Sequence, residues 1–209
     1  MTGFFSLAMA ITDLGESTVL LSTALAASCW FWLSRQRQLA LIWLFAVGGC
    51  GATMLVFKLG FLTCGHLVLN GTVHTPSGHS AMSALFYGAA ALTAQRLAPQ
   101  MARHSVLLQA TGVLMALAIG ASRVVVHAHT PQEVVVGLTI GFAWLGVFAW
   151  LLRKTEPSMA MPPAAVLCVL GLLYGGLLFI TMLGQHMTVE GLLFHVARLL
   201  NLRWGVCVG

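Results

Sequence analysis

Long apolar stretches separated by short polar connections dominate the pattern of this chain. Each stretch is close to the roughly 17–25 residues that cross the hydrocarbon core of a bilayer as a helix. Apolar residues are continuous in these stretches, whereas the strands of a membrane β-barrel alternate. The pattern therefore predicts an all-α fold, a polytopic membrane helix bundle of about six transmembrane helices in a single integral membrane domain, residues 1–209. The predicted spans are Ser17–Ser34, Leu39–Phe57, His79–Gln95, Ser105–Gly120, Glu133–Leu152 and Ala164–Leu183.

Two further apolar segments lie at the ends of the chain. Residues Met1–Ile11 are too short to span a bilayer and lack the basic start and cleavage site of a signal peptide, so we expect an embedded or interfacial lead-in. Residues Thr188–Leu202 place leucine and valine at helical spacing with polar residues between them, which predicts a helix in the membrane surface.

Charge is scarce and unevenly placed. The chain is 59% hydrophobic and 7% charged, with a net charge of +5. Basic residues in alternate connections mark one side as cytoplasmic under the positive-inside rule, and the remaining connections then face outward. Because no basic run exceeds two residues, we expect membrane lipids as partners and no nucleic acid. The residues that mark the cytoplasmic side are Arg35, Arg37, Arg96, Arg103, Arg153 and Lys154.

Reactive side chains concentrate in two outward-facing stretches, Thr75–His79 and Ser122–Glu133. Histidine, arginine and glutamate are costly against a membrane, so their presence there indicates function. Thr130 suits a helix N-cap and Pro131 a first helical turn, which places His129 at the mouth of a helix.

The second stretch has the spacing of an activated histidine. Glu133 lies four residues after His129 and reaches back to the imidazole around the helix start. A carboxylate on one ring nitrogen fixes the tautomer and leaves the other nitrogen as a nucleophile or base. Arg123 ends the preceding helix, and its planar guanidinium suits a phosphate or a carboxylate.

The first stretch is suited to holding an anion. Ser77 and Gly78 lead into a helix whose free N–H groups and positive end favour negative charge, and His79 can supply a proton. Lys58 closes the second apolar stretch on the same face. Together these groups predict phosphoryl transfer by electrostatic clamping and covalent catalysis.

These motifs resemble those of the type 2 phosphatidic acid phosphatase (PAP2) superfamily of membrane phosphatases. Its Pro-Ser-Gly-His block is present in full at residues 76–79. Its Ser-Arg-x5-His-x3-Asp block is matched at Ser122, Arg123 and His129, with Glu133 in the place of the aspartate. Its Lys-x6-Arg-Pro block retains only the lysine, Lys58, because Gly65 and His66 occupy the Arg-Pro positions.

The resemblance implies a PAP2/acid-phosphatase-like core over residues 39–152 and a metal-independent hydrolase without a cofactor. His129 would carry a phosphohistidine intermediate, Glu133 would orient it, and His79 would protonate the leaving oxygen. The groups that would bind the substrate phosphate are Lys58, Ser77, Gly78 and Arg123.

The resemblance also implies a lipid phosphate or diphosphate as substrate, of the undecaprenyl diphosphate, phosphatidylglycerol phosphate or phosphatidic acid type. We expect a bacterial inner membrane with the site facing the periplasm. The missing arginine leaves one cation fewer around the phosphate, and three histidines are candidates to compensate: His66, His74 and His127.

Three alternatives stay open from the sequence. A lipid phosphotransferase would use the same phosphohistidine. A non-catalytic PAP2-like lipid-binding protein would have lost turnover with the arginine. A zinc enzyme or transporter would need ligands among His74, His79, His127, His129 and Glu133, whose spacing departs from helical zinc motifs. Head group, lipid tail and oligomeric state are not specified by the sequence.

Overall fold

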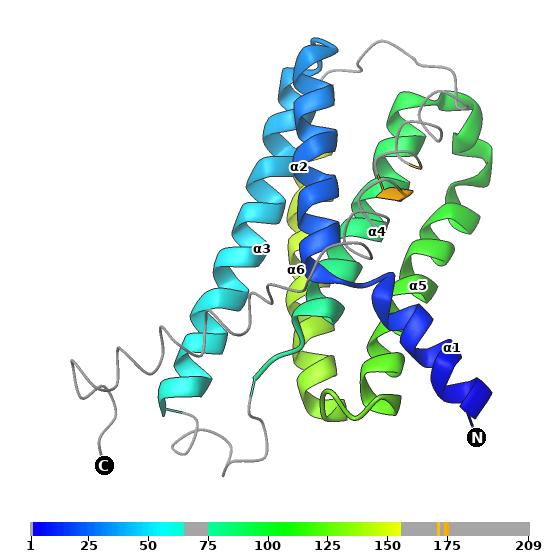
Figure 1. Cartoon of the computed structure of the whole chain (residues 1–209). Helices are drawn as coiled ribbons and strands as arrows, with labels where there is room; N and C mark the ends of the chain where they lie inside the picture. Colours follow the sequence, from blue (N-terminus) through cyan, green and yellow to red (C-terminus); the bar gives the residue numbers. More distant parts are fainter. Residues whose placement is uncertain (1, 65–74, 156–170, 172–173, 176–209) are drawn as a thin grey trace.

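The computed structural model describes residues 2–64, 75–155, 171 and 174–175, and every regular element in these ranges is a helix. The all-α prediction is therefore confirmed. Helices α2 to α6 stand side by side as a bundle, and α1 leaves it at an angle (Figure 1). The elements are α1 (Thr2–Asp13), α2 (Ser17–Leu33), α3 (Arg37–Cys64), α4 (Gly78–Leu97), the 3₁₀ helix η3 (Pro99–His104), α5 (Ser105–Val125) and α6 (Pro131–Arg153).

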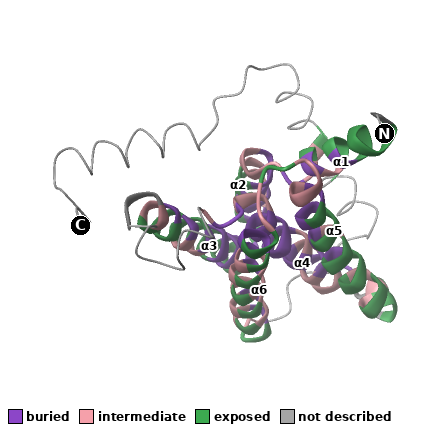
Figure 2. Ribbon diagram, turned by 90° about the horizontal axis from the view of Figure 1, so that it is seen from below, coloured by how far each residue is buried: buried purple, intermediate pink, exposed green. Residues whose placement is uncertain are grey.

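Helix α4 is the centre of the bundle. Viewed along the bundle it is enclosed by the other helices and is buried almost throughout, whereas α3, α5 and α6 expose their outer faces (Figure 2). Since α4 is shielded from lipid, it tolerates the polar residues Ser80, Ser83 and Thr93, each fully buried. Trp43 of α3 donates a hydrogen bond from its indole nitrogen to the Thr93 hydroxyl at 3.1 Å, which satisfies one of them.

Four helical stretches in the described part of the chain are long and apolar enough to cross a membrane. They are Gly3–Leu33, Arg37–Phe61, Ser105–Val125 and Pro131–Arg153. These helices identify an integral membrane protein. Helix α4, which contains the predicted span His79–Gln95, is not among these four. Protein surrounds this helix, and it carries buried polar side chains. The predicted span Ala164–Leu183 lies almost wholly outside the described residues, and the predicted surface helix entirely, so the count of six stays a prediction.

Helix α3 is longer than the sequence pattern predicts. We expected Lys58 to close this span, but the helix continues to Cys64. Apolar residues resume directly after the lysine at Leu59 and Phe61, so nothing in the pattern ends the helix there. Lys58 consequently lies inside the helix, where it is 8% exposed.

Two glycines in the first half of α6 bring this helix into contact with the start of α4. A Cβ on Gly137 would lie 2.4 Å from the Ser77 carbonyl oxygen, and one on Gly141 would lie 2.2 Å from that of Ala81. Small residues four apart allow membrane helices to approach this closely. Gly49 of α3 likewise packs against the Trp144 ring of α6, while nothing lies within 4 Å of a Cβ on Gly48 or Gly51.

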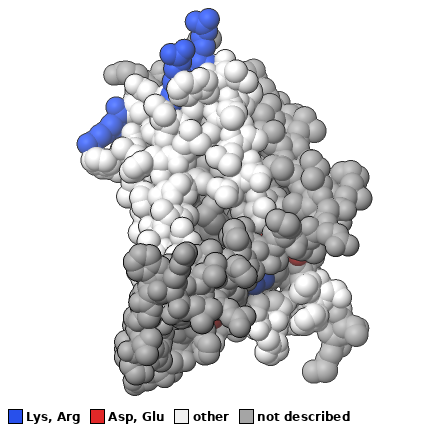
Figure 3. Space-filling model, turned by 60° about the vertical axis from the view of Figure 1, so that its left-hand side comes forward, with Lys and Arg blue, Asp and Glu red and all other residues white. Residues whose placement is uncertain are grey.

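Basic side chains gather at one end of the bundle (Figure 3). That end holds the C-termini of α2, α4 and α6 (Figure 1). Lys154 Nζ lies 3.6 Å from the centre of the Trp150 ring, and the Arg37 guanidinium lies 5.5 Å from that of Trp32. Cation–π contacts of this kind hold charge at the rim of an apolar bundle. The two reactive stretches begin or precede helices at the opposite end.

Candidate active site

The start of α6 is built as the sequence predicts. Thr130 is its N-cap and accepts a hydrogen bond from the Glu133 N–H at 3.4 Å, while the Glu133 carboxylate accepts one from the Thr130 N–H at 3.0 Å. This reciprocal capping box fixes both side chains at the first turn, and Pro131 occupies the position where its missing N–H costs nothing.

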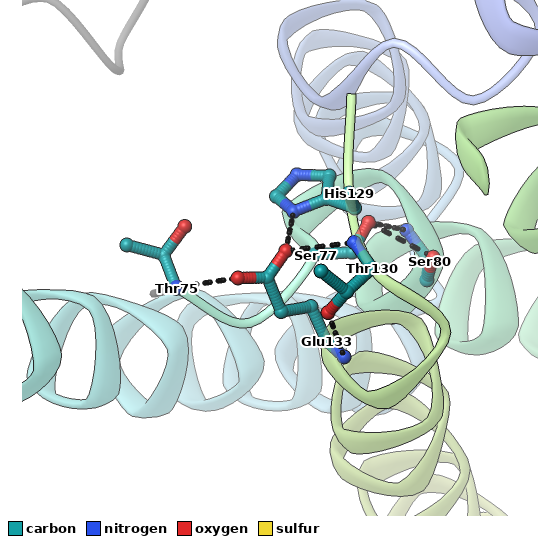
Figure 4. A network of polar contacts seen from close by, with 6 residues as sticks. All are labelled: Thr75, Ser77, Ser80, His129, Thr130 and Glu133. Atoms are coloured by element: carbon teal, nitrogen blue, oxygen red, sulfur yellow. Dashed lines mark hydrogen bonds and ion pairs between the residues drawn. The ribbon is translucent and has the colours of Figure 1, made fainter. Parts of the chain in front are cut away.

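His129 is held by the same carboxylate. Its Nδ1 atom lies 2.9 Å from Glu133 Oε2, and the two side chains are only 6% and 5% exposed. An ionised carboxylate can only accept, so the proton of a neutral imidazole sits on Nδ1 and the lone pair on Nε2. The Nε2 edge of the ring points away from Glu133 (Figure 4). The predicted pairing of these two residues is therefore present.

The loop before His129 is fixed by the end of α5. The N–H of Ala128 and that of His129 both donate to the Arg123 carbonyl, at 3.0 and 3.2 Å. His127 adopts a left-handed backbone, with φ 56°, at the position that usually holds glycine in this kind of helix ending. Arg123 thus lies in the last turn of α5, as predicted, and its backbone positions His129.

Glu133 also joins the two reactive stretches. Its Oε1 atom accepts a hydrogen bond from the Thr75 N–H at 3.0 Å, and its backbone oxygen accepts one from the Ser77 N–H at 3.1 Å. The carboxylate therefore stands between the histidine of one stretch and the backbone of the other (Figure 4). The structure brings the two stretches together, as the sequence predicts.

Ser77 has a capping role that the sequence analysis did not assign. It is the fully buried N-cap of α4, and its hydroxyl oxygen accepts hydrogen bonds from the Ser80 N–H at 3.4 Å and the Ser80 hydroxyl at 2.9 Å. Those contacts use its lone pairs and leave its own proton to donate. Phosphate binding by Ser77 stays a prediction.

Lys58 reaches the start of α4. Its Nζ atom lies 3.7 Å from the point where a Cβ on Gly78 would stand. The Ser17 hydroxyl of α2 lies 3.5 Å from the same point, a neighbour that the sequence analysis missed. Because these are ordinary contact distances, a Cβ would fit at Gly78, and the two polar groups lie beside the positive end of α4.

His79 directly follows Gly78 in the first turn of α4 and is half-buried. Lys58 Nζ lies beside Gly78, the N–H of the neighbouring Ser77 donates to the Glu133 backbone oxygen, and the Glu133 carboxylate holds His129. His79 lies in the first turn of α4 and Arg123 in the last turn of α5. Their predicted roles, proton donor and phosphate ligand, stay predictions.

Within residues 2–64 and 75–155, no three histidine, cysteine, aspartate or glutamate side chains are grouped in a way that suits a metal ion. His74, which belongs to the zinc hypothesis, lies outside the described residues, and so do Gly65 and His66.

The sequence model of the PAP2 superfamily matches residues 61–157, which contain both reactive stretches and helices α4 to α6. The chain is also similar to the "Uncharacterized 22.5 kDa protein in cps region" of Klebsiella pneumoniae, with 35% identity over 147 residues that cover 69% of each chain. No solved structure matches the chain.

Proposed function

The chain belongs to the PAP2 superfamily, and on this premise we propose that it is a membrane phosphatase that hydrolyses a lipid phosphate or diphosphate through a phosphohistidine on His129. Membership by itself suggests phosphatase-type activity. The observation that carries the finer proposal is the buried pair of His129 and Glu133, in which the carboxylate is also held by two backbone N–H groups. Such a pair orients a histidine that attacks through its other nitrogen.

In the first step, the lone pair of His129 Nε2 forms a bond to phosphorus. The bond between phosphorus and the leaving oxygen breaks, and that oxygen takes a proton from His79. The ring of His129 becomes cationic while its Nδ1–H still donates to Glu133 at 2.9 Å. The nearby carboxylate stabilises this charge, which favours the intermediate over the separated reactants.

In the second step, a water oxygen attacks phosphorus and gives a proton to His79, which is now neutral. The N–P bond breaks, and its electron pair returns to Nε2. Phosphate leaves, and the protonated His79 is ready for the next substrate. His79 thus gives one proton to the substrate and takes one from water, as general acid and then general base, while His129 serves as the nucleophile.

The phosphate oxygens are proposed to lie at the start of α4. Lys58 Nζ and the Gly78 backbone border this point, and the positive helix end adds to the attraction for an anion. Arg123, in the last turn of α5, is proposed as the second cation that binds the phosphate. Its backbone carbonyl accepts the hydrogen bond from the His129 N–H. Ser77, the N-cap of α4, is proposed to donate its hydroxyl proton to a phosphate oxygen.

The substrate is proposed to be a lipid, because the helices around the site are apolar and expose large hydrophobic side chains. Undecaprenyl diphosphate, phosphatidylglycerol phosphate and phosphatidic acid are the candidates. The basic residues in the predicted cytoplasmic connections gather at one end of the bundle (Figure 3), and the site lies at the other end, where α4 and α6 begin. With basic residues on the cytoplasmic side, the site would face the periplasm from a bacterial inner membrane.

The test is phosphate release from a panel of these lipids by the detergent-solubilised protein in EDTA. We expect release by the wild type, none by His129→Ala, and wild-type release by His104→Ala. His104 is the matched control, an exposed histidine in η3 at the basic end. Equal activity of His129→Ala and wild type would remove His129 as the nucleophile.

Labelled substrate separates the remaining alternatives. A phosphohistidine should appear as label that is trapped on the wild-type protein, stable to base and lost in acid. If the protein carries no label after incubation with any of the lipids, a non-catalytic lipid-binding protein is favoured. Transfer of the label to an added acceptor lipid, in place of free phosphate, would identify a phosphotransferase.

A further inference from the structure

The connection between α1 and α2, Asp13–Ser17, is packed into the bundle beside the site. The Leu14 carbonyl accepts a hydrogen bond from the Tyr87 hydroxyl of α4 at 2.7 Å. A Cβ on Gly15 would lie 2.2 Å from a methyl carbon of Ile119 and 3.0 Å from the Ser83 hydroxyl. These contacts insert the connection between α4 and α5. This segment precedes the residues 61–157 that match the superfamily, so the motifs say nothing about it.

The C-terminal end of this connection lies close in space to the start of α4. Ser17, the first residue of α2, places its hydroxyl 3.5 Å from the point where a Cβ on Gly78 would stand, and Lys58 Nζ lies 3.7 Å from that point. A hydroxyl and an ammonium group therefore lie within ordinary contact distance of the same point at a helix start. Three kinds of donor meet there: the ammonium group, the hydroxyl and the first N–H groups of α4.

The Ser17 hydroxyl is available for a ligand. It is half-buried and makes no hydrogen bond to any residue that the structure describes. The carboxylate of the preceding Glu16 is engaged elsewhere, because it accepts hydrogen bonds from the N–H groups of Thr18 and Val19 in the first turn of α2. Its negative charge is thus balanced by the positive end of that helix.

We propose that Ser17 is a further substrate-binding residue, whose hydroxyl donates a hydrogen bond to a phosphate oxygen of the substrate at the start of α4. The inference rests on the proposed function. Ser17 would supply a hydrogen-bond donor from outside the superfamily motifs. The site needs one because the first motif has Gly65 where the family carries arginine. The neutral Ser17 hydroxyl would replace part of the phosphate binding that the arginine provides in the family, without adding a positive charge.

The test compares Ser17→Ala with Ser17→Thr, which keeps a hydroxyl, and with the control Ser22→Ala, a half-buried serine on the same helix. Hydrogen bonds to charged groups are worth enough that Ser17→Ala should lower kcat/KM by about tenfold to a hundredfold. Inhibition by inorganic phosphate should weaken in parallel. Ser17→Thr should recover most of the loss, and Ser22→Ala should match the wild type.

Two failures are distinguishable. If the wild type releases phosphate and Ser17→Ala behaves as Ser22→Ala does, the role of Ser17 is overturned while the phosphatase stands. If the wild type releases no phosphate from any lipid, the proposed function falls, and Ser17 is judged by binding of labelled inorganic phosphate to the same variants. Equal binding by Ser17→Ala and wild type overturns the inference.

A folding check accompanies these measurements. The variants are compared by size-exclusion elution and by thermal unfolding in detergent. Should Ser17→Ala fail to fold, Ser17→Cys keeps the size of the side chain while its thiol is a weak donor. Its kcat/KM is then expected to fall severalfold, and wild-type kinetics from Ser17→Cys would overturn the proposal.

Discussion

His129 and Glu133 form a pair whose Nδ1 and Oε2 atoms are 2.9 Å apart, and the same carboxylate holds the backbone of Thr75 at 3.0 Å. One buried side chain therefore orients the proposed nucleophile and also ties it to the segment that starts α4. Catalytic geometry and local folding depend on the same group, so its substitution should affect both.

Glu133→Gln should lower kcat by about 10²- to 10⁴-fold, the range that positioned acid–base groups supply. The amide has one oxygen, so it cannot accept from Thr75, Thr130 and His129 together, and its NH₂ group would face a donor. Leaving a buried donor unsatisfied should also cost about 1–3 kcal/mol of stability. Steady-state kinetics and thermal unfolding in detergent measure the two effects.

Glu133→Asp is the matched comparison, since it keeps the charge and shortens the arm by one methylene. We expect its activity to lie between that of the wild type and that of Glu133→Gln. An aspartate variant less active than the glutamine variant would mean that negative charge at this position is not what supports the reaction.

Gly137→Ala should destabilise the contact of α6 with α4. The new Cβ would stand 2.4 Å from the Ser77 carbonyl oxygen, so backbone must shift, and overpacking of this kind costs about 1–3 kcal/mol. The shift would also stretch the hydrogen bond from the Ser77 N–H to the Glu133 backbone oxygen, so activity should fall too.

The control is Gly146→Ala on the same helix, where nothing lies within 4 Å of the added Cβ. Alanine there should be neutral or stabilise the helix by up to about 1 kcal/mol. Equal unfolding temperatures for the two alanine variants would contradict the close contact of α4 and α6.

Thr12→Val should weaken the attachment of α1 to α5. The Thr12 hydroxyl lies 2.7 Å from that of Ser122, which itself donates to the Ile119 carbonyl at 2.7 Å. Hydrogen bonds between membrane helices average about 0.6 kcal/mol, so we expect a small loss of stability. Ser122 directly precedes Arg123, the proposed phosphate ligand, so a looser end of α5 should misplace that side chain and lower kcat/KM severalfold.

The control for this variant is Thr139→Val, an exposed threonine whose hydroxyl bonds only within α6, to the Val135 carbonyl. Kinetics of phosphate release from the two valine variants make the comparison. Wild-type kcat/KM for Thr12→Val would show that α1 does not position the end of α5.

The proposed orientation predicts which residues an impermeant maleimide reaches in intact cells. In a protein with its native cysteines replaced, Ala128→Cys near the site should be labelled from outside, and Arg103→Cys in η3 only after the membrane is opened. Both positions are exposed. The reverse pattern would place the site in the cytoplasm.

Local features of this site could be predicted from the sequence. The N-cap at Thr130, the helix start at Pro131 and the pairing of His129 with Glu133 all lie within five residues of chain, where backbone geometry alone brings the groups together. The long continuous apolar stretches likewise indicated helices, because a span must satisfy its own backbone hydrogen bonds in lipid.

Only the tertiary structure decided the contacts between distant segments. It placed the Thr75 N–H on Glu133, Lys58 inside α3 and against Gly78, and Ser17 beside them. These contacts depend on how closely helices cross, which is set by single glycines such as Gly137. A continuous apolar stretch shows which residues avoid water but not which helix covers them, since lipid and protein are equally apolar neighbours.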